Sequence, residues 1–281
     1  KPFVYFCRKH RTKMLQFISF GSGSSGNSCL LFTENEGLLI DAGIGVRTLR
    51  KHLREYGIPL SKINNILITH DHADHVMSVG SLSRDFQLPV YTTEKVHKGI
   101  YGNWCVKHKI AQSLQKVIEK GKTFRLGDFE ITPFEVPHDS TDNVGYKIVA
   151  QGVCFCLMTD IGIITDEMKT VIAEAQYLVI EANHDEEMLK NGPYSQHLKG
   201  RILGPRGHLS NTDCGKAIAE NATSKLKHAW LCHLSDENNH PELAKKTVEQ
   251  VLQSYGIIAG VDFSLDILKR KTPTGIYELK P

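Results

Sequence analysis

Residues 69–75 read Thr-His-Asp-His-Ala-Asp-His, which places three imidazoles and two carboxylates within six consecutive positions. The apolar run Ile66-Leu67-Ile68 directly before them has the length and the β-branched character of a buried strand. Alternation along the extended part puts His70 and His72 on one side, while Asp74 and His75 begin a helix and can face a second ion. Imidazole nitrogen and carboxylate oxygen are donors that borderline divalent cations accept. The stretch therefore predicts a metal site at a sheet edge rather than a solvated polar loop.

Length and composition indicate an ordinary globular protein. A chain of 281 residues with 41% hydrophobic content can bury a large core in one domain, which we expect to span residues 14–281. Residues 1–13 are interpreted as a basic extension, non-native or disordered, before a natural start at Met14. No apolar run approaches the roughly 20 residues of a membrane span, and no signal peptide opens the chain. The seven scattered cysteines indicate reduced thiols, so we expect a cytoplasmic protein without a membrane partner.

Positive charge is concentrated locally. The net charge is only +3, yet residues 94–125 carry eight Lys/Arg against Glu94 and Glu119. This segment, which includes Lys107 and Lys109, is either a solvated face or a phosphate-binding surface. Tyr101 and Trp104 lie among its lysines and could stack on a base, but packing in the core is the favoured interpretation of these two rings.

Further polar side chains follow predicted strands. They are Asp41 after Leu38 to Ile40, His138 after Phe129 to Val136, Asp160 after Val153 to Met158, Asn183 and His184 after Tyr177 to Ile180, and His233 after Ala229 to Cys232. Asp41 could also cap the next helix, and His184 could be a metal ligand, a phosphate contact or a helix cap. Asp160 stands out because a carboxylate can bridge two cations. Alternating strands and helices with polar clusters at strand ends predict an α/β sandwich, with two sheets face to face and helices outside.

Three motifs resemble those of known families. The 70–75 stretch resembles the His-x-His-x-Asp-His signature of the metallo-β-lactamase-fold hydrolases. The Ser/Gly-rich loop 22–28, which taken alone is also typical of a flexible turn, and the element Glu181-Ala182-Asn183-His184-Asp185 resemble those of the YycJ/WalJ family of DNA exonucleases. The resemblance covers residues 15–281 and implies a four-layer αββα sandwich of the metallo-β-lactamase fold, with two mixed sheets face to face.

The resemblance also implies roles for individual residues. One metal would be held by His70, His72 and His138, the other by Asp74, His75 and His233, and Asp160 would bridge them. Asp41 would support the histidine loop from behind the ligands. His208 resembles the histidine that aids leaving-group departure in phosphodiesterase members, although it could instead cap the helix that begins near Asn211. The expected substrate contacts are Ser25, Asn27, Asn183, His184, Lys107 and Lys109.

Together these assignments predict a hydrolase with two divalent ions, Zn²⁺ or Mn²⁺, and a metal-bridging hydroxide as nucleophile. A nucleic-acid phosphodiester, most simply DNA digested 5′-to-3′ as the family resemblance implies, suits the basic segment, because each phosphate that Lys or Arg neutralises releases counterions. A thioester (glyoxalase II-like) or small phosphodiester hydrolase is the enzymatic alternative. A nucleic-acid-binding protein with a structural metal is the alternative without catalysis.

Overall fold

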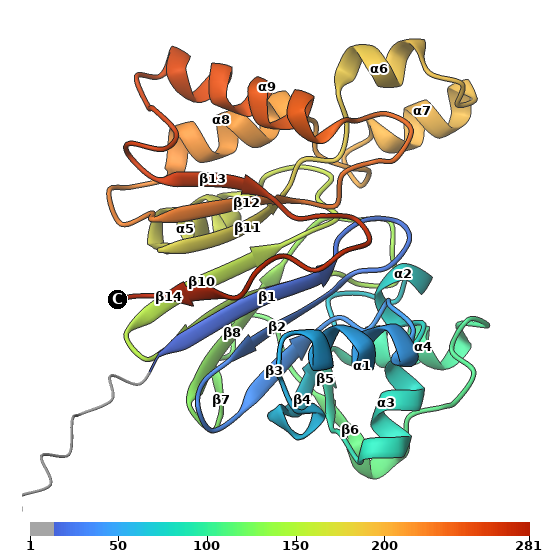
Figure 1. Cartoon of the computed structure of the whole chain (residues 1–281). Helices are drawn as coiled ribbons and strands as arrows, with labels where there is room; N and C mark the ends of the chain where they lie inside the picture. Colours follow the sequence, from blue (N-terminus) through green and yellow to red (C-terminus); the bar gives the residue numbers. More distant parts are fainter. Residues whose placement is uncertain (1–13) are drawn as a thin grey trace, which may run out of the picture.

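The computed structural model describes residues 14–281, so the predicted extension at residues 1–13 lies outside the described residues. Two seven-stranded mixed sheets form the centre of this part of the chain (Figure 1). In spatial order, the first sheet contains β14 (Tyr277–Leu279), β1 (Leu15–Gly21), β2 (Ser28–Phe32), β3 (Gly37–Ile40), β4 (Ile63–Leu67), β5 (Val90–Thr92) and β6 (Gln115–Val117). The second contains β13 (Ser264–Ile267), β12 (His228–Cys232), β11 (Tyr177–Glu181), β10 (Val153–Met158), β9 (Val144–Ala150), β8 (Phe129–Glu135) and β7 (Phe124–Leu126).

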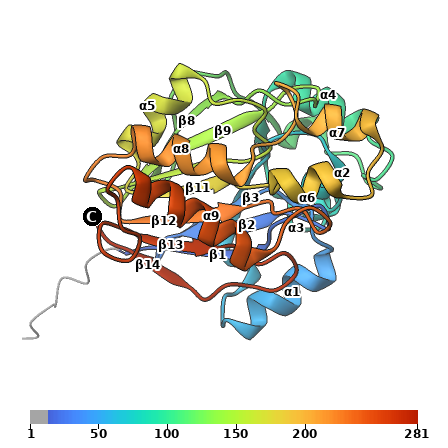
Figure 2. The ribbon, with the colours of Figure 1, turned by 90° about the horizontal axis from the view of Figure 1, so that it is seen from above.

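Helices cover the outer face of each sheet. On the first sheet these are α1 (Val46–Glu55), α2 (Ala73–Val76), α3 (Val79–Phe86) and α4 (Glu94–Gly102). Over the second lie α5 (Asp166–Glu174), α8 (Asn211–Asn221) and α9 (Pro241–Ser254), as Figure 2 shows from above. The shorter α6 (Glu186–Asn191) and α7 (Gln196–Ile202) lie at the same end of the sandwich as α2 and α4 in both views.

Three hydrophobic clusters match these layers. The central one joins the facing sheets through residues such as Phe17, Phe155 and Trp230, all buried. A second packs α5, α8 and α9 against β10 to β12, and a third packs α1 and α3 against the first sheet. The alternation of apolar residues therefore produces four layers, and the predicted αββα sandwich is confirmed.

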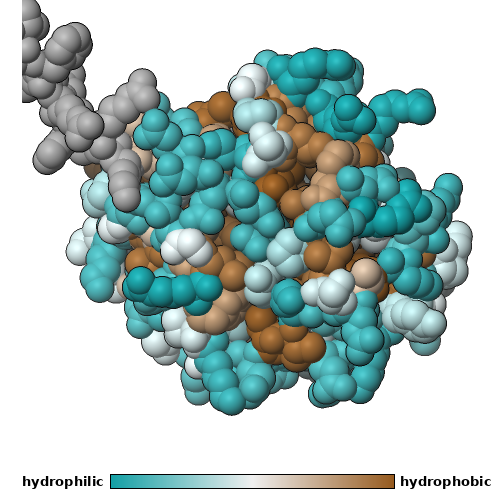
Figure 3. All heavy atoms as spheres, turned by 90° about the horizontal axis from the view of Figure 1, so that it is seen from below, coloured by the Kyte–Doolittle hydropathy of each residue, from teal (hydrophilic) through white to brown (hydrophobic). Residues whose placement is uncertain are grey.

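The outer surface is largely polar. Seen from below, hydrophilic side chains dominate, and the hydrophobic residues that reach the surface lie in several separate patches (Figure 3). Within residues 14–281, no helix has both the length and the apolar character that a membrane span requires. The predicted histidine stretch lies at the end of the sandwich where α2, α4, α6 and α7 gather.

Candidate metal centre

The predicted histidine stretch forms the turn between β4 and α2. His70 and His75 are fully buried, His72 is the N-cap residue of α2, and Asp74 lies in the first turn of that helix. The apolar strand β4 ends at the sheet edge, so the polar side chains that follow it are released together at one end of the sandwich. One short segment thus supplies four candidate ligands.

Asp41 holds this turn in place. Its carboxylate accepts hydrogen bonds from the Thr69 backbone N–H (2.8 Å) and from Nδ1 of His75 (2.7 Å). Because Nδ1 of His75 is used in this way, Nε2 is left to face Asp160, whose Oδ2 is 3.3 Å away. The structure places Asp41 behind the histidines, where it fixes the orientation of a ring. Gly45 rather than Asp41 is the N-cap residue of α1.

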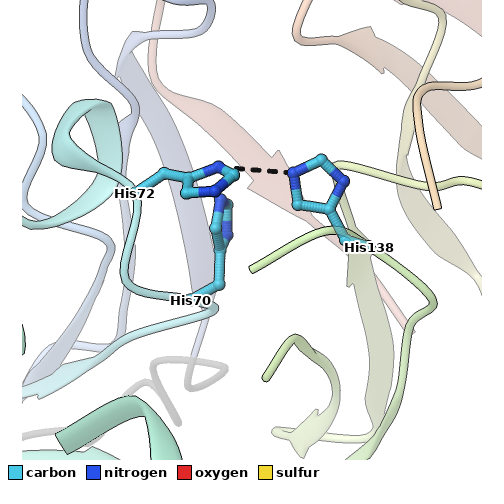
Figure 4. Close-up of side chains that lie close together, drawn as sticks. All are labelled: His70, His72 and His138. Atoms are coloured by element: carbon cyan, nitrogen blue, oxygen red, sulfur yellow. Dashed lines mark hydrogen bonds between the residues drawn. The ribbon is translucent and has the colours of Figure 1, made fainter. Parts of the chain in front are cut away.

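His138 arrives from the second sheet, directly after β8. Figure 4 shows it facing His70 and His72, with its Nε2 3.3 Å from Nδ1 of His72. Its Nδ1 donates to the carbonyl oxygen of Gly207 (3.0 Å), which fixes the ring with Nε2 inward. Nitrogen atoms of the three rings lie within 4.8 Å of one another, a spacing that a single ion can span.

Asp160 lies at the centre of the cluster. Its carboxylate oxygens are 4.0 Å from Nε2 of His70, 3.7 Å from Nε2 of His138 and 3.5 Å from Nδ1 of His233. The side chain is 2% exposed, and Oδ2 also accepts a hydrogen bond from the Thr159 hydroxyl (2.8 Å). The carboxylate therefore stands between ligands from both halves of the chain.

Glu181 is a buried carboxylate that positions side chains and backbone on the second-sheet side of the site. No role was predicted for it from the sequence. Its Oε1 accepts from Nδ1 of His208 (2.8 Å) and Nδ1 of His233 (3.0 Å). Its Oε2 accepts from the backbone N–H groups of Ile161 (2.7 Å) and Leu209 (3.0 Å). The sequence could have indicated this role, because an acid that ends the apolar strand β11 would be buried and would need hydrogen-bond partners.

Backbone strain concentrates at the site. Asp41, Asp160 and His233 each follow a strand and adopt positive φ values of 59°, 56° and 53°. Such left-handed residues are uncommon and cluster at functional sites, where the surrounding structure holds them. Ser22 helps to hold His233 in this conformation, because its hydroxyl accepts a hydrogen bond from the His233 backbone N–H (2.9 Å).

The pKa values of the histidines shift in different directions within the cluster. Burial, followed by the neighbouring His75 ring, holds the pKa of His70 well below its usual value. Burial also lowers the pKa of His75, but Asp41, Asp160 and Asp74 outweigh it and raise the pKa to about 10. Burial lowers the pKa of His208 too, yet the Glu181 carboxylate raises it above its usual value.

The two central carboxylates are held ionised. Burial alone raises the pKa of Asp160, but the rings of His233, His75 and His70 bring it well below its usual value. Burial likewise raises the pKa of Glu181, and the neighbouring His208 and His233 lower it to about 2. The centre thus combines buried negative charge with imidazole nitrogens, the donor set of a divalent cation.

One unsatisfied atom supports a cation at this position. Nε2 of His70 is buried and has no hydrogen-bond partner among residues 14–281, although buried polar atoms normally have one. It points into the group formed by His70, His75 and Asp160, whose ligand atoms lie within 4.8 Å of one another. The residues therefore fit a bound metal ion, and the clusters are consistent with divalent metal binding.

The predicted substrate residues of the Ser/Gly-rich loop separate. Ser25 is exposed at the turn. Asn27 is buried, and its amide nitrogen is 3.2 Å from Oδ2 of Asp74 and 2.9 Å from Nε2 of His75. Its contacts are thus with candidate ligands, which favours a supporting position over the predicted contact with substrate.

A cavity of about 180 Å³ opens beside the cluster. Asn183, His208 and His233 line one part of it, and Tyr194 and Arg201 from the α6–α7 region line another. Asn183 also donates to the carbonyl oxygen of His233 (2.8 Å). Tyr194 and Arg201 were not predicted, because the sequence between residues 186 and 202 carries no motif that marks a binding wall.

His208 and His184 occupy different places. His208 lies between His138 and His233, with ring centroids 5.0 and 5.4 Å away, and the cap of α8 is Ser210, so the helix-cap interpretation of His208 is wrong. His184 is 1% exposed and lines a second cavity of about 480 Å³, which His208 also lines and His233 does not. Neither of its ring nitrogens bonds to another described residue, and the N-cap of α6 is Asp185 rather than His184.

The basic segment is exposed, and one expectation about it was wrong. Lys107 and Lys109 lie on the surface as predicted for a solvated or phosphate-binding face. Tyr101 and Trp104, expected in the core, are 67% and 90% exposed. They lie at the end of α4 and in the loop after it, where the backbone turns outward instead of returning under a sheet.

Comparison with known proteins agrees with this geometry. Residues 37–233 match the family described as the Beta-lactamase superfamily domain. The chain is 37% identical over 265 residues to the exodeoxyribonuclease YycJ of Bacillus anthracis, covering 93% of this chain and 98% of that protein. It is 37% identical over 258 residues to the exodeoxyribonuclease WalJ of Streptococcus pneumoniae, covering 92% and 96%.

Solved structures share the fold. The metallo-β-lactamase fold protein YhfI from Bacillus subtilis superimposes with a TM-score of 0.70 at 18% identity, covering 95% of this chain and all of that one. Zinc-bound PqqB from Methylobacterium extorquens gives a TM-score of 0.66 at 17% identity, covering 92% of this chain and 99% of that one. The chain therefore belongs to the metallo-β-lactamase-fold hydrolases and, among them, to the family of the exodeoxyribonucleases YycJ and WalJ.

Proposed function

We propose that the protein is a DNA exonuclease that uses two divalent ions, Zn²⁺ or Mn²⁺, and digests a strand in the 5′-to-3′ direction. The observation that carries this proposal is the ring of candidate ligands around Asp160, with His208 at its edge and a cavity of about 180 Å³ beside it. The relatives that match 92–93% of this chain are named exodeoxyribonucleases, which supports DNA as the substrate.

The two ions would have separate ligand sets with one shared carboxylate. His70, His72 and His138 form one set, Asp74, His75 and His233 form the other, and Asp160 faces both. Bound cations would supply a water of lowered pKa as the nucleophile and positive charge for the phosphoryl oxygens. Asp41 and Asn27 would keep the rings and the Asp74 carboxylate aligned.

His208 is the candidate proton donor. Glu181 accepts from its Nδ1 and so directs the other ring nitrogen, Nε2, away from the buried carboxylate. The side chain is 20% exposed and lines the cavity, so a departing sugar oxygen can approach it. A proton delivered to that oxygen would stabilise the leaving group, the role that a positioned general acid performs.

The phosphodiester is favoured over a thioester by the surface around the site. Lys107 and Lys109 are exposed and would attract successive phosphates, whereas a thioester has no use for them. Asn183 would contact the strand near the metal centre, because it lines the same cavity as His208, and Ser25 would do so from the exposed turn next to Ser24, which lines that cavity too. The second cavity, which His184 lines together with His208, has no assigned place in this mechanism.

Digestion of end-labelled nucleic acid tests the proposal. Single- and double-stranded DNA and RNA, each labelled at one end, would be incubated with protein whose metal content has been measured. A 5′-to-3′ exonuclease releases the 5′ label as a short product at once, while a 3′ label stays on long fragments until late. Internal cuts from the start would contradict exonuclease action, and equal digestion of RNA would contradict the preference for DNA. Hydrolysis of a thioester alone would replace the proposal with the alternative class.

A further inference from the structure

Trp104 is exposed to an unusual degree for its type. It is 90% exposed, whereas Trp230, the other tryptophan of the chain, is fully buried in the central core. Tyr101, one helical turn earlier, is 67% exposed. A large aromatic ring gains most from removal of its apolar surface from water, so an exposed indole held in an ordered loop indicates a binding surface.

The loop that carries Trp104 is attached to the metal centre. The side-chain amide of Asn103 donates to the backbone carbonyl of Asp71 (2.7 Å), the residue between His70 and His72. The other end of the same amide accepts from the backbone N–H of Cys105 (2.9 Å). Trp104 therefore directly follows Asn103, which is hydrogen-bonded to the turn that bears two candidate ligands. Hydrogen bonds of the residues on either side of Trp104 hold its backbone in place.

Positive charge lies on the same exposed segment as the Trp104 ring. Nζ of Lys109 lies 5.2 Å from the centroid of the Tyr101 ring and contacts the Tyr101 carbonyl, which keeps the ammonium group beside Tyr101. Lys107 forms no ion pair with any residue of the described part of the chain. The acids of this segment are paired within it, Glu94 with Lys98 and Glu119 with Lys122, and neither acid pairs with Lys107 or Lys109. Unpaired cations next to exposed rings match the combination of phosphates and bases in an unpaired strand.

We propose that Trp104 is a stacking platform for a base of the substrate strand, with Lys107 and Lys109 on the adjoining phosphates. This inference rests on the proposed nuclease function and specifies its substrate as an unpaired end. A base inside a duplex has both faces covered by its neighbours, so only a frayed or single-stranded end can offer a face to the indole. The platform would hold the strand while the neighbouring phosphodiester lies at the metal centre.

The intrinsic fluorescence of the protein measures this directly, because Trp104 is the exposed tryptophan and Trp230 is buried. Metal-loaded protein would be titrated with oligothymidylate that carries phosphorothioate linkages to resist cleavage. We expect the emission to be quenched on binding. Because Trp104→Ala lacks the reporting indole, its binding is measured by the fluorescence anisotropy of the same oligonucleotide carrying a dye. This variant should bind roughly 5-fold to 150-fold more weakly than the wild type, the affinity equivalent of one stacked base. Trp104→Phe should recover part of this loss, since it keeps a ring.

Matched controls separate stacking from folding. Tyr255→Ala removes another exposed ring, which lies at the end of α9, and should bind like the wild type. An oligonucleotide of the same length with abasic sites keeps the phosphates but lacks the bases, so the wild type and Trp104→Ala should bind it equally. Equal binding of the intact strand by both proteins, or an unchanged emission, would reject the platform. If the platform is rejected but the wild-type protein digests DNA, the nuclease proposal still stands. If the wild-type protein binds the strand through Trp104 but digests no nucleic acid, only the nuclease proposal is rejected.

Discussion

The two halves of the sandwich build the metal centre in different ways. The half that contains the first sheet supplies His70, His72, Asp74 and His75 from a single turn after β4. The half that contains the second sheet supplies its residues from separate strand ends and loops: His138, Asp160, Glu181, His208 and His233. The first group is aligned mainly by local geometry, while the second is aligned only after several distant strands have paired.

The supporting carboxylates show the same difference. Asp41 orients one ring, His75, and its other contacts are with Thr69 in the same turn. Glu181 orients both His208 and His233 and also accepts two backbone N–H groups. A defect at Asp41 should therefore affect one ligand, whereas a defect at Glu181 should affect both His208 and His233.

Asp160→Ala should have the largest effect, because this carboxylate faces ligands from both halves. We expect the wild type to hold two ions per chain and the variant to hold fewer, with an activity loss larger than the roughly 10- to 100-fold typical of residues that only support ligands. Elemental analysis of the purified proteins measures the metal content, and digestion of DNA measures the activity. Asp166→Ala, at an exposed carboxylate on α5, is the matched control. One ion in the wild type and an unchanged content in the variant would exclude the paired arrangement.

His208→Ala and His233→Ala should separate two histidines that share one carboxylate. We expect His233→Ala to lower the metal content, because it removes a candidate ligand. His208→Ala should retain both ions yet lose about 10²- to 10⁴-fold in rate on DNA, the usual contribution of a proton donor. The loss should be smaller on bis-p-nitrophenyl phosphate, whose leaving group departs without a proton. Near-normal DNA cleavage by folded, metal-loaded His208→Ala would remove the acid role.

Glu181→Gln should show how far the second half depends on its carboxylate. Glutamine keeps one acceptor oxygen but turns the other into an NH₂ group, which cannot accept from the donors around Glu181. We expect a loss of roughly 10- to 100-fold in metal affinity or rate. Asp41→Asn is the comparison in the first half and should weaken chiefly the ion bound by His75. Equal, small effects of both variants would mean that neither half relies on its supporting acid.

Reversal of Lys107 and Lys109 to Glu should give the smallest effect, because exposed charges act through screened interactions. DNA binding should weaken, and each lost phosphate contact should reduce the slope of log K against log salt by roughly 0.7 to 0.9. The same reversal at Lys225 and Lys246, exposed lysines elsewhere, is the control. If turnover of a small phosphodiester fell as much as that of DNA, the two lysines would be supporting the fold instead of the strand.

Much of the fold follows from local patterns. The strand predicted from Val153 to Met158 is β10 with the same bounds, and the strand predicted from Ala229 to Cys232 is β12, which begins one residue earlier. The helix predicted after His75 is divided into α2 and α3, because the chain turns at Met77 and Ser78. The helices α6 and α7 were not predicted, since within them only Leu189, Lys199 and Ile202 are buried and no apolar period marks them.

The sequence by itself determined the candidate ligands of the first half. Six consecutive positions after an apolar strand carry their own geometry, because strand alternation and the start of a helix place side chains without help from distant residues. The same local rule marked His138, Asp160 and His233 as polar residues at strand ends, though not as neighbours.

Only the tertiary structure decided which of those residues meet and which side chains stay outside. The pairing of β10, β11 and β12 brings Asp160, Glu181 and His233 to one edge, which no local pattern states. It also buries His184 at a cavity that His233 does not line and leaves Trp104 exposed beside the histidine turn. The reason is physical: burial and contact depend on the packing of residues far apart in the chain, whereas periodicity reports only the face that a residue takes within its own element.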